Sequence, residues 1–271
     1  MTSTEPTRVS HLNVILEDFD ASIKHWTELF DANFMLDLPR PEWHACLVEI
    51  GGVIFEVFAP GNFLLNSRHG PHYLGMEYEA KMAQVRKSLV AHNVRIIRDH
   101  DIALHTHPAD GLGVAWEFYE GSFHGENAAN VTRPERPIAY WRDEHPLGLM
   151  GLKAYTLQVS DMESARQFVE TFLGGQVKYD EPRPALGARA VGLQVADGIL
   201  ELLSPTGDGV LRRDMELVGQ GIRSAVFHAR SLEQSRRYFD GRKVPLIDGS
   251  APGRFAIAPE ANRGVLFEFS E

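Results

Sequence analysis

The sequence of 271 residues has very little cysteine and no long apolar run. Cys46 is its only cysteine, so an internal disulfide is excluded. No stretch approaches the roughly 20 apolar residues that a membrane-spanning helix needs. The first residues lack the basic start and apolar core of a signal peptide, so we expect a soluble, cytoplasmic protein.

Basic residues are scarce relative to acidic ones. The chain has 27 Lys and Arg against 37 Asp and Glu, a formal net charge of −10. Because no cationic excess exists to neutralise phosphates, neither nucleic acid nor an anionic membrane surface is an expected partner. The apolar fraction of 44% is ordinary for a globular protein, and the length suits two domains. We therefore expect a small-molecule substrate, which could be aromatic. The protein could also form a homo-oligomer.

One pattern occurs four times along the chain. Its first copy is a strand over 9–16, an acidic turn, a helix with apolar residues on one face, and two strands joined by a Gly-Gly turn typical of a hairpin. Further copies begin at His72, Leu152 and Gly221, and each ends in an apolar strand. We therefore predict an α+β fold of four βαβββ modules.

A segment rich in proline, asparagine and charge separates the second module from the third. This segment, 121–148, has neither the period of a strand nor that of a helix. We expect a paired-module domain over 1–120, a linker over 121–148, and a second paired-module domain over 149–271.

Histidine and glutamate occur at matched places in the first two modules. His11 heads the first strand of module one and Glu56 lies in its last strand, while His72 and Glu117 do the same in module two. Each pair is separated by 45 residues. A carboxylate among apolar residues is costly to bury unless it is paired, hydrogen-bonded or bound to a metal. Pairing the modules would bring both imidazoles and both carboxylates together, a donor set suited to one divalent ion such as Fe, Mn, Ni, Co or Zn.

In the second half the carboxylates persist without the histidines. Glu201 and Glu268 lie in the last strands of modules three and four, whereas Ala154 and Ser224 stand where His11 stands in module one. We therefore predict one metal site, in the first half, and loss of the ligands in the second.

Five further side chains are candidates near a site. His105 and His107 alternate along a predicted strand and so share a face, where one could act as acid or base; exposed positions on a hairpin are the alternative. Tyr119 shares the face of the glutamate on its strand, and Trp43 begins a strand, so both are candidates for substrate contact. His228 is expected to fill a pocket or bond to backbone rather than to bind a second metal.

The whole pattern resembles a known superfamily. The four modules, the opening HLNVILEDFDAS and the strand endings FEV, WEF, LEL and FEF are similar to the vicinal oxygen chelate superfamily, which includes glyoxalases, epimerases, extradiol dioxygenases and bleomycin-resistance-type binding proteins. In that superfamily paired modules form a cup of curved sheet that holds the metal. The resemblance implies two cup-shaped domains, with His11, Glu56, His72 and Glu117 as metal ligands in the first.

The resemblance also implies a reaction class. A set of two histidines and two glutamates is similar to the glyoxalase and epimerase branches, which implies a lyase or isomerase acting on a small oxygenated compound chelated to the metal. Glu56 or Glu117 would be the base, with His105 or His107 as its substitute. The alternatives are an Fe(II) extradiol dioxygenase that cleaves a catechol-like ring, and a non-catalytic protein that sequesters a drug-like molecule.

Overall fold

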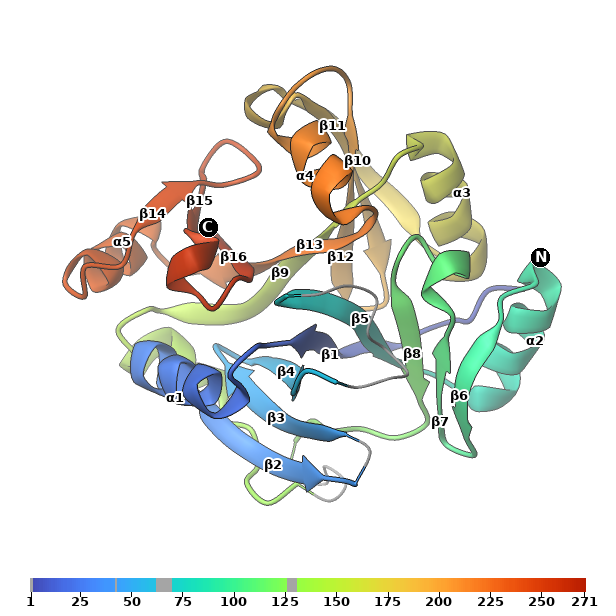
Figure 1. Ribbon diagram of the computed structural model, residues 1–271, viewed down its shortest axis with the longest axis horizontal. Helices are drawn as coiled ribbons and strands as arrows, with labels where there is room; N and C mark the ends of the chain where they lie inside the picture. The colour runs from blue at the N-terminus through green and yellow to red at the C-terminus, as the bar shows by residue number, and fades with distance from the viewer. Residues whose placement is uncertain (1, 42, 62–69, 126–130) are drawn as a thin grey trace. The chain divides into compact units, whose positions relative to one another are not determined.

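The computed structural model describes residues 2–41, 43–61, 70–125 and 131–271 (Figure 1). Within these ranges each of four consecutive segments has one strand, one helix and three further strands, so the predicted βαβββ modules are confirmed. Module one comprises β1 (Arg8–Ile15), α1 (Phe19–Phe30), β2 (Asn33–Pro39), β3 (His44–Ile50) and β4 (Val53–Phe58). Module two comprises β5 (His72–Glu79), α2 (Met82–His92), β6 (Ile96–His100), β7 (Ala103–Thr106) and β8 (Ala115–Tyr119).

The second half repeats the arrangement with one addition. Module three comprises β9 (Leu149–Gln158), α3 (Met162–Phe172), β10 (Gln176–Arg183), β11 (Ala188–Val195) and β12 (Gly198–Pro205). Module four comprises β13 (Gly221–Ala229), α5 (Leu232–Asp240), β14 (Leu246–Asp248), β15 (Arg254–Ile257) and β16 (Leu266–Ser270). The helix α4 (Val210–Val218) lies between them and was not predicted. No described helix is both long and apolar enough to cross a membrane.

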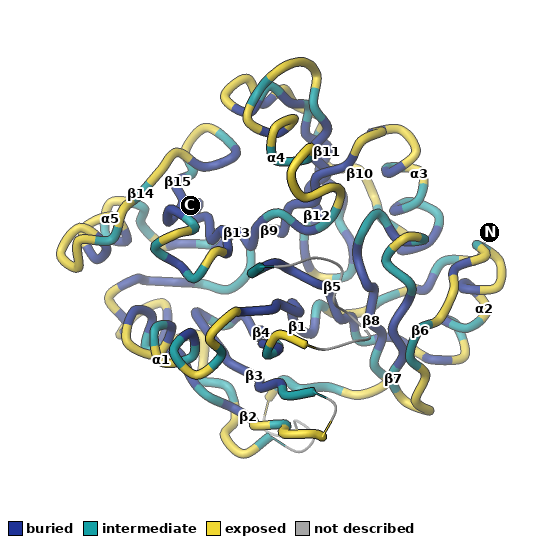
Figure 2. The backbone as a smooth tube through the Cα atoms, in the orientation of Figure 1, coloured by how far each residue is buried: buried dark blue, intermediate teal, exposed yellow. Residues whose placement is uncertain are grey.

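The strands form two eight-stranded sheets. The first has the order β2-β3-β4-β1-β5-β8-β7-β6 and the second the order β10-β11-β12-β9-β13-β16-β15-β14. In every module the first strand runs parallel to the last, and the other pairings are antiparallel. The strands β1, β4, β5 and β8 are buried over most of their length (Figure 2). The first and last strands of modules one and two therefore carry side chains into protected surroundings.

The predicted hairpin of module one is confirmed at its Gly-Gly turn. Ile50 pairs with Val53, and Gly51 and Gly52 both have positive φ angles, 61° and 79°. This is the backbone conformation that two-residue hairpin turns require and that glycine adopts at little cost. A Cβ at Gly51 would also lie 2.5 Å from Cδ1 of Leu149, so the turn has no room for a side chain.

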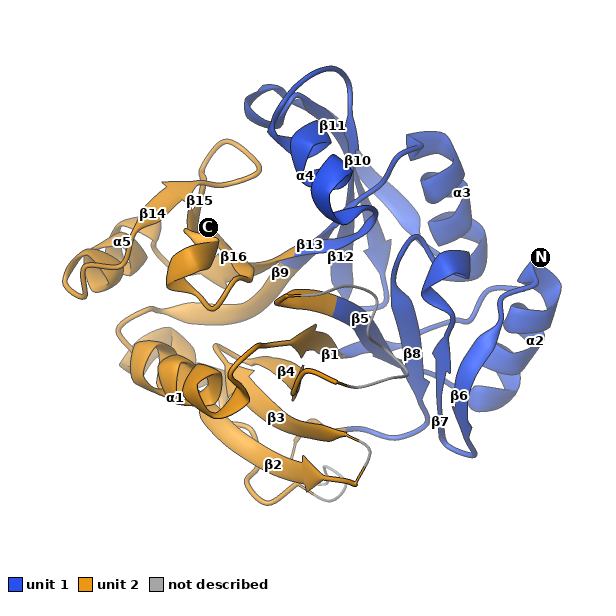
Figure 3. Ribbon diagram, viewed as in Figure 1, with its two compact units in different colours: residues 1–10, 74–122, 154–223 blue, residues 11–73, 123–153, 224–271 orange. Residues whose placement is uncertain are grey.

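The chain divides into two compact units, which combine modules from both halves (Figure 3). Unit 1 contains 1–10, 74–122 and 154–223, and unit 2 contains 11–73, 123–153 and 224–271. Four of the five boundaries pass through β1, β5, β9 and β13, the first strand of each module, and the fifth follows β8, between residues 122 and 123. Each sheet comes from one predicted domain, whereas each unit draws on both, so the domain bounds 1–120 and 149–271 stay a prediction.

Aromatic side chains dominate the core of unit 2. Trp26 and Phe30 on α1 lie 5.3 and 5.7 Å from the ring of Phe267 on β16, and Phe30 also contacts Phe239 on α5. The indole of Trp26 donates a hydrogen bond to Asn262 Oδ1. Burying one such side chain contributes about 1.5–3 kcal/mol to the free energy of unfolding.

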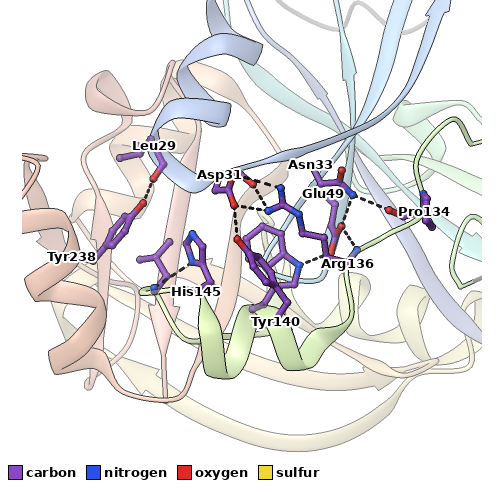
Figure 4. Close-up of polar contacts among 11 residues, drawn as sticks. Leu29, Asp31, Asn33, Glu49, Pro134, Arg136, Tyr140, His145 and Tyr238 are labelled. Carbon is purple, nitrogen blue, oxygen red and sulfur yellow. Dashed lines mark hydrogen bonds and ion pairs between the residues drawn. The ribbon is translucent and has the colours of Figure 1, made fainter.

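The connecting segment is tied to module one by a buried carboxylate. Glu49 on β3 accepts hydrogen bonds from Trp141 Nε1 at 2.6 Å, from the backbone N of Arg136 at 2.8 Å and from Asn33 Nδ2 at 3.0 Å (Figure 4). Burial raises the pKa of Glu49, although all three donors oppose that shift. The Arg136 guanidinium also pairs with Asp31 at 2.6 Å. The segment 131–148 is thus anchored in unit 2 by directed polar contacts.

His145 gives this anchor a dependence on pH. The ring packs 5.1 Å from that of Trp141, and its Nδ1 accepts a hydrogen bond from the backbone N of Leu147 (Figure 4). Burial lowers the pKa of His145 to about 4, even though Asp31 opposes the shift. Below the ordinary value of 6.5 the unfolded chain therefore binds a proton that the folded protein does not.

We expect the free energy of unfolding to fall between pH 6.5 and pH 4, by up to about 1.4 kcal/mol per pH unit from this group. Urea unfolding at pH 7, 6 and 5 measures the effect. The variant His145→Asn has no titrating group there, so its stability should fall less steeply with decreasing pH. Parallel profiles for the two proteins would show that His145 does not contribute.

Candidate metal centre

One imidazole and two carboxylates gather in the first sheet. His11 lies on β1, Glu77 on β5 and Glu117 on β8, which are neighbours in the sheet order. Each offers one ligand atom, and these atoms all lie within 4.8 Å of one another. All three side chains are buried. We call this set the metal triad, because nitrogen and carboxylate oxygen at such distances can surround one divalent cation.

Strand register explains why two carboxylates meet. β5 runs parallel to β8 with Glu77 directly opposite Glu117, and cross-strand partners project from the same face. Only 2% of Glu77 and 6% of Glu117 is exposed. Two ionised carboxylates held side by side away from water repel each other, and the repulsion is relieved when a cation binds between them. The donor types and the burial of the metal triad therefore fit a divalent metal.

The register also shows that the equal spacing of 45 residues does not give His72 and Glu117 the relative positions of His11 and Glu56. In module one Glu56 pairs with Asn13, and in module two Glu117 pairs with Glu77. Glu77 is thus the counterpart of Asn13. The structure therefore places Glu77 within the metal triad, a residue that the sequence interpretation missed.

The counterpart of His11 in module two is Gly75. A Cβ at Gly75 would lie 2.1 Å from a backbone carbonyl oxygen of β8, so an imidazole fits there only if the backbone moves. His72 stands at the start of β5, an odd number of residues before Glu77, which in a regular strand directs its side chain to the opposite face. Its Nδ1 lies 2.6 Å from the carbonyl oxygen of Gly70. The assignment of His72 as a ligand stays a prediction, now with Glu77 as its rival.

Glu56 lies beside the metal triad without belonging to it. Its Oε2 is 3.4 Å from His11 Nε2, and its side chain is 12% exposed, against 2% for that of His11. The ring of Phe123 packs edge-on against the His11 ring, with centroids 5.6 Å apart. Phe123 also packs on a buried apolar cluster that includes Leu47 and Ile54. His11 therefore has a carboxylate and an apolar wall among its neighbours.

Comparison with known proteins identifies the fold. Neither a protein-family model nor a curated protein matches the sequence. Among solved structures, the chain is similar to a mutant of 4-hydroxymandelate synthase from Streptomyces coelicolor, with a TM-score of 0.75 and 12% identity over 97% of this chain and 92% of that chain. It is also similar to methylmalonyl-CoA epimerase from Mycobacterium tuberculosis, with a TM-score of 0.43 and 22% identity over 45% of this chain and 87% of that chain. The match over nearly the whole chain is thus to a structure with the vicinal oxygen chelate fold. This chain has the vicinal oxygen chelate fold.

Three further candidates lie in the same half of this vicinal oxygen chelate fold. His105 on β7 bonds Glu117 on β8, with Nε2 and Oε1 2.8 Å apart. Tyr119 ends β8 and is half-buried, two residues after Glu117; burial raises its pKa, and the negative charge of Glu77 adds to the shift. His107 lies beyond the end of β7, where its Nδ1 accepts a hydrogen bond from the backbone N of Ala109. His105 and Tyr119 thus lie near the carboxylates, whereas His107 caps a turn.

The two remaining candidates, Trp43 and His228, lie close to other side chains of the protein. Trp43 packs against Phe58, with ring centroids 6.0 Å apart, just before β3 begins. His228 is half-buried on β13, and its pKa is lowered by burial and by the nearby positive charge of Lys153. Contact of Trp43 with a substrate stays a prediction.

In the second half, protein donors surround the glutamate of module three. Glu201 is fully buried, accepts a hydrogen bond from Tyr179 OH at 2.6 Å and pairs with Arg183 Nη2 at 3.0 Å. Tyr179 reaches it across Gly192, where a Cβ would lie 2.2 Å from the phenol ring. The buried guanidinium supplies the positive charge that a metal would otherwise supply.

The glutamate of module four is held by hydroxyl and amide donors. Glu268 accepts hydrogen bonds from Ser224 Oγ at 2.6 Å, from Ser250 Oγ at 2.6 Å and from the backbone N of Ser250 at 2.7 Å. Ser224 stands two residues before the partner of Glu268, as His11 does for Glu56. In both modules the carboxylates are satisfied by fixed protein donors.

Proposed function

We propose that this protein is a metal-dependent enzyme that holds one divalent cation on His11, Glu77 and Glu117. The observation that carries the proposal is the gathering of three buried ligand atoms within 4.8 Å, two of them from carboxylates in direct cross-strand register. When bound, the cation would polarise a chelated substrate oxygen and stabilise negative charge that develops on it. The fold supports the proposal, because the predicted resemblance to a metal-binding superfamily is confirmed at the level of the fold.

The donor set favours particular metals. The metal triad has one imidazole and two carboxylates, whereas the set expected from the sequence has two imidazoles and two carboxylates. Oxygen therefore makes up a larger share of the donors in the metal triad. Carboxylate-rich sites suit Mn(II), and imidazole suits iron and the later metals, so Mn(II) and Fe(II) satisfy both donor types. We propose one of these two ions as the resident metal.

The reaction we propose is proton transfer at carbon, in an isomerase or lyase. The substrate is a small compound with two neighbouring oxygen atoms, which would bind a cation held by the three protein ligands. Glu56 is the base: its carboxylate lies 3.4 Å from the His11 ring and keeps partial access to solvent. Phe123 offers an apolar surface next to His11, which suits an apolar substituent on the substrate.

A second candidate is oxygen chemistry at the same centre. His11, Glu77 and Glu117 would hold the cation, and a cation held by only three protein ligands could also supply oxygen chemistry to a bound substrate. Oxygen chemistry is favoured if Glu56 does not bind the cation, and Glu56 is not a member of the metal triad.

The test begins with elemental analysis of protein purified without added metal. Mn(II)-loaded protein is then incubated in D₂O, under argon and under air, with α-hydroxyketones, 2-oxo acids and catechols, while NMR follows deuterium exchange and an electrode follows oxygen. Exchange that is independent of oxygen supports proton transfer. Substrate-dependent oxygen uptake would favour the second candidate, and a protein that binds no divalent metal would refute both in favour of simple sequestration.

A further inference from the structure

His105 makes a single directed contact with a member of the metal triad. It lies on β7 directly opposite Glu117 on β8, and its Nε2 is 2.8 Å from Glu117 Oε1. Their side chains are only 3% and 8% exposed. Both residues belong to unit 1 and to adjacent antiparallel strands, so backbone hydrogen bonding fixes the distance between them.

The two ring nitrogens of His105 have different surroundings. Nε2 faces a carboxylate oxygen, whereas Nδ1 is buried and has no hydrogen-bond partner in the described part of the chain. A hydrogen on Nε2 is donated to the carboxylate, but a hydrogen on Nδ1 would be a buried donor without an acceptor, which is unfavourable. The ring hydrogen is therefore placed on Nε2.

This hydrogen bond holds the carboxylate of Glu117 in one orientation. Its Oε1 accepts from His105 Nε2 at 2.8 Å. The bond also limits rotation of the carboxylate, which would otherwise turn about its last side-chain torsion. Outer-shell hydrogen bonds of this kind orient metal ligands and are typically worth about 10–100-fold in metal affinity.

We propose that His105 is a positioning residue that holds Glu117 in the orientation required for metal binding, by donating its Nε2 hydrogen. This inference rests on the proposed function, because it needs a cation at the metal triad. It assigns His105 no part in proton transfer to substrate. The other half of the protein offers a contrast: Ala256 faces Glu268 at the corresponding place, and serine donors hold that carboxylate instead.

Two variants of His105 test the proposal, because only one of them keeps a side chain that can donate a hydrogen bond. In His105→Leu the donor is lost, whereas in His105→Gln the amide NH₂ still donates to Glu117. Metal-free protein is titrated with Mn(II), and the signal of free Mn(II) is followed by electron paramagnetic resonance. We expect affinity to fall about 10–100-fold in the Leu variant and to recover largely in the Gln variant. His107→Leu, on the same hairpin but bonded to Ala109, is the matched control and should bind like wild type.

The outcomes separate this role from the proposed function. Wild-type protein that binds no Mn(II) would overturn the proposed function and this inference with it. Wild-type binding with no loss in His105→Leu, or with equal loss in the Leu and Gln variants, would overturn the positioning role alone. Long-range ¹H–¹⁵N spectra of the metal-free wild type need no variant: a His105 ring with hydrogen on Nε2 supports the proposal, and hydrogen on Nδ1 alone contradicts it.

Discussion

Glu77→Gln will remove most of the metal-binding capacity, whereas His72→Gln will leave it nearly intact. Glu77 supplies a buried carboxylate to the metal triad, and the Gln amide keeps its size while losing its charge. We expect a loss in Mn(II) affinity of more than about 100-fold, above the effect typical of an outer-shell partner. Isothermal titration of metal-free protein measures it. The reverse order of effects would restore the ligand set expected from the sequence.

The same pair of variants separates the two ligand sets by thermal stability. A ligand that binds only the folded state raises its stability by about 2.7 kcal/mol at a free concentration of 100 times Kd. Adding Mn(II) should therefore raise the Tm of the wild type and of His72→Gln, but not that of Glu77→Gln or His11→Ala. His228→Ala, in the second half, should respond like the wild type.

Metal-free Glu77→Gln should also melt at a higher temperature than the metal-free wild type. Glu77 and Glu117 face each other across β5 and β8, so removing one charge removes their repulsion. A rise in stability accompanied by a loss of metal binding is the behaviour expected of a ligand. A residue that merely supports the fold would lose both.

The elements of the fold could be predicted because they depend on local patterns. Trp26 and Phe30 recur at helical spacing and are buried on α1, and the Gly51-Gly52 turn joins β3 to β4 as its sequence indicates. The periodicity of apolar residues depends only on residues close together in the sequence, so helices and strands can be predicted without knowing which strands pair. The helix α4 was missed because it lies between modules three and four, outside the repeated βαβββ pattern, and only Leu211 among its residues is buried.

The residues of the candidate site were harder to predict than the fold, because they depend on the register between strands that are far apart in the sequence. Equal spacing of 45 residues suggested that His72 corresponds to His11, yet the two modules reach their last strands through loops and strands of different length. Register pairs Glu117 with Glu77 instead. The signal available in the sequence was Glu77 itself, which lies within the apolar strand LGMEYE, where an unpaired carboxylate is costly to bury.

The residues that bond to Glu201 and Glu268 in the second half could not be predicted from the sequence either. Arg183 and Tyr179 reach Glu201 from β10, and Ser250 reaches Glu268 from the stretch between β14 and β15. Arginine, tyrosine and serine are common on strands and turns, so nothing in their local sequence indicates a buried acceptor. Sequence alone showed only that the histidines were missing.

Glu56→Gln will lower turnover about 10²–10⁴-fold while leaving Mn(II) affinity close to that of the wild type. The carboxylate lies next to His11 but outside the metal triad, so its loss removes a proton acceptor rather than a ligand. The amide keeps the shape of the side chain and cannot accept a proton at neutral pH. Turnover is measured as deuterium exchange into whichever compound of the screen reacts with the wild type, and metal affinity is measured on the same preparations.

The position of Glu56 makes this variant decisive between the two candidate reactions. If Glu56 is the base, exchange is lost, oxygen is not consumed, and replacing Mn(II) by Co(II) or Ni(II) in the wild type preserves activity, because only charge stabilisation is required of the metal. If the centre carries out oxygen chemistry instead, turnover consumes oxygen, survives in Glu56→Gln and fails with Ni(II). Retained turnover in Glu56→Gln together with substrate-dependent oxygen uptake would therefore replace proton transfer by oxygen chemistry at the same three ligands.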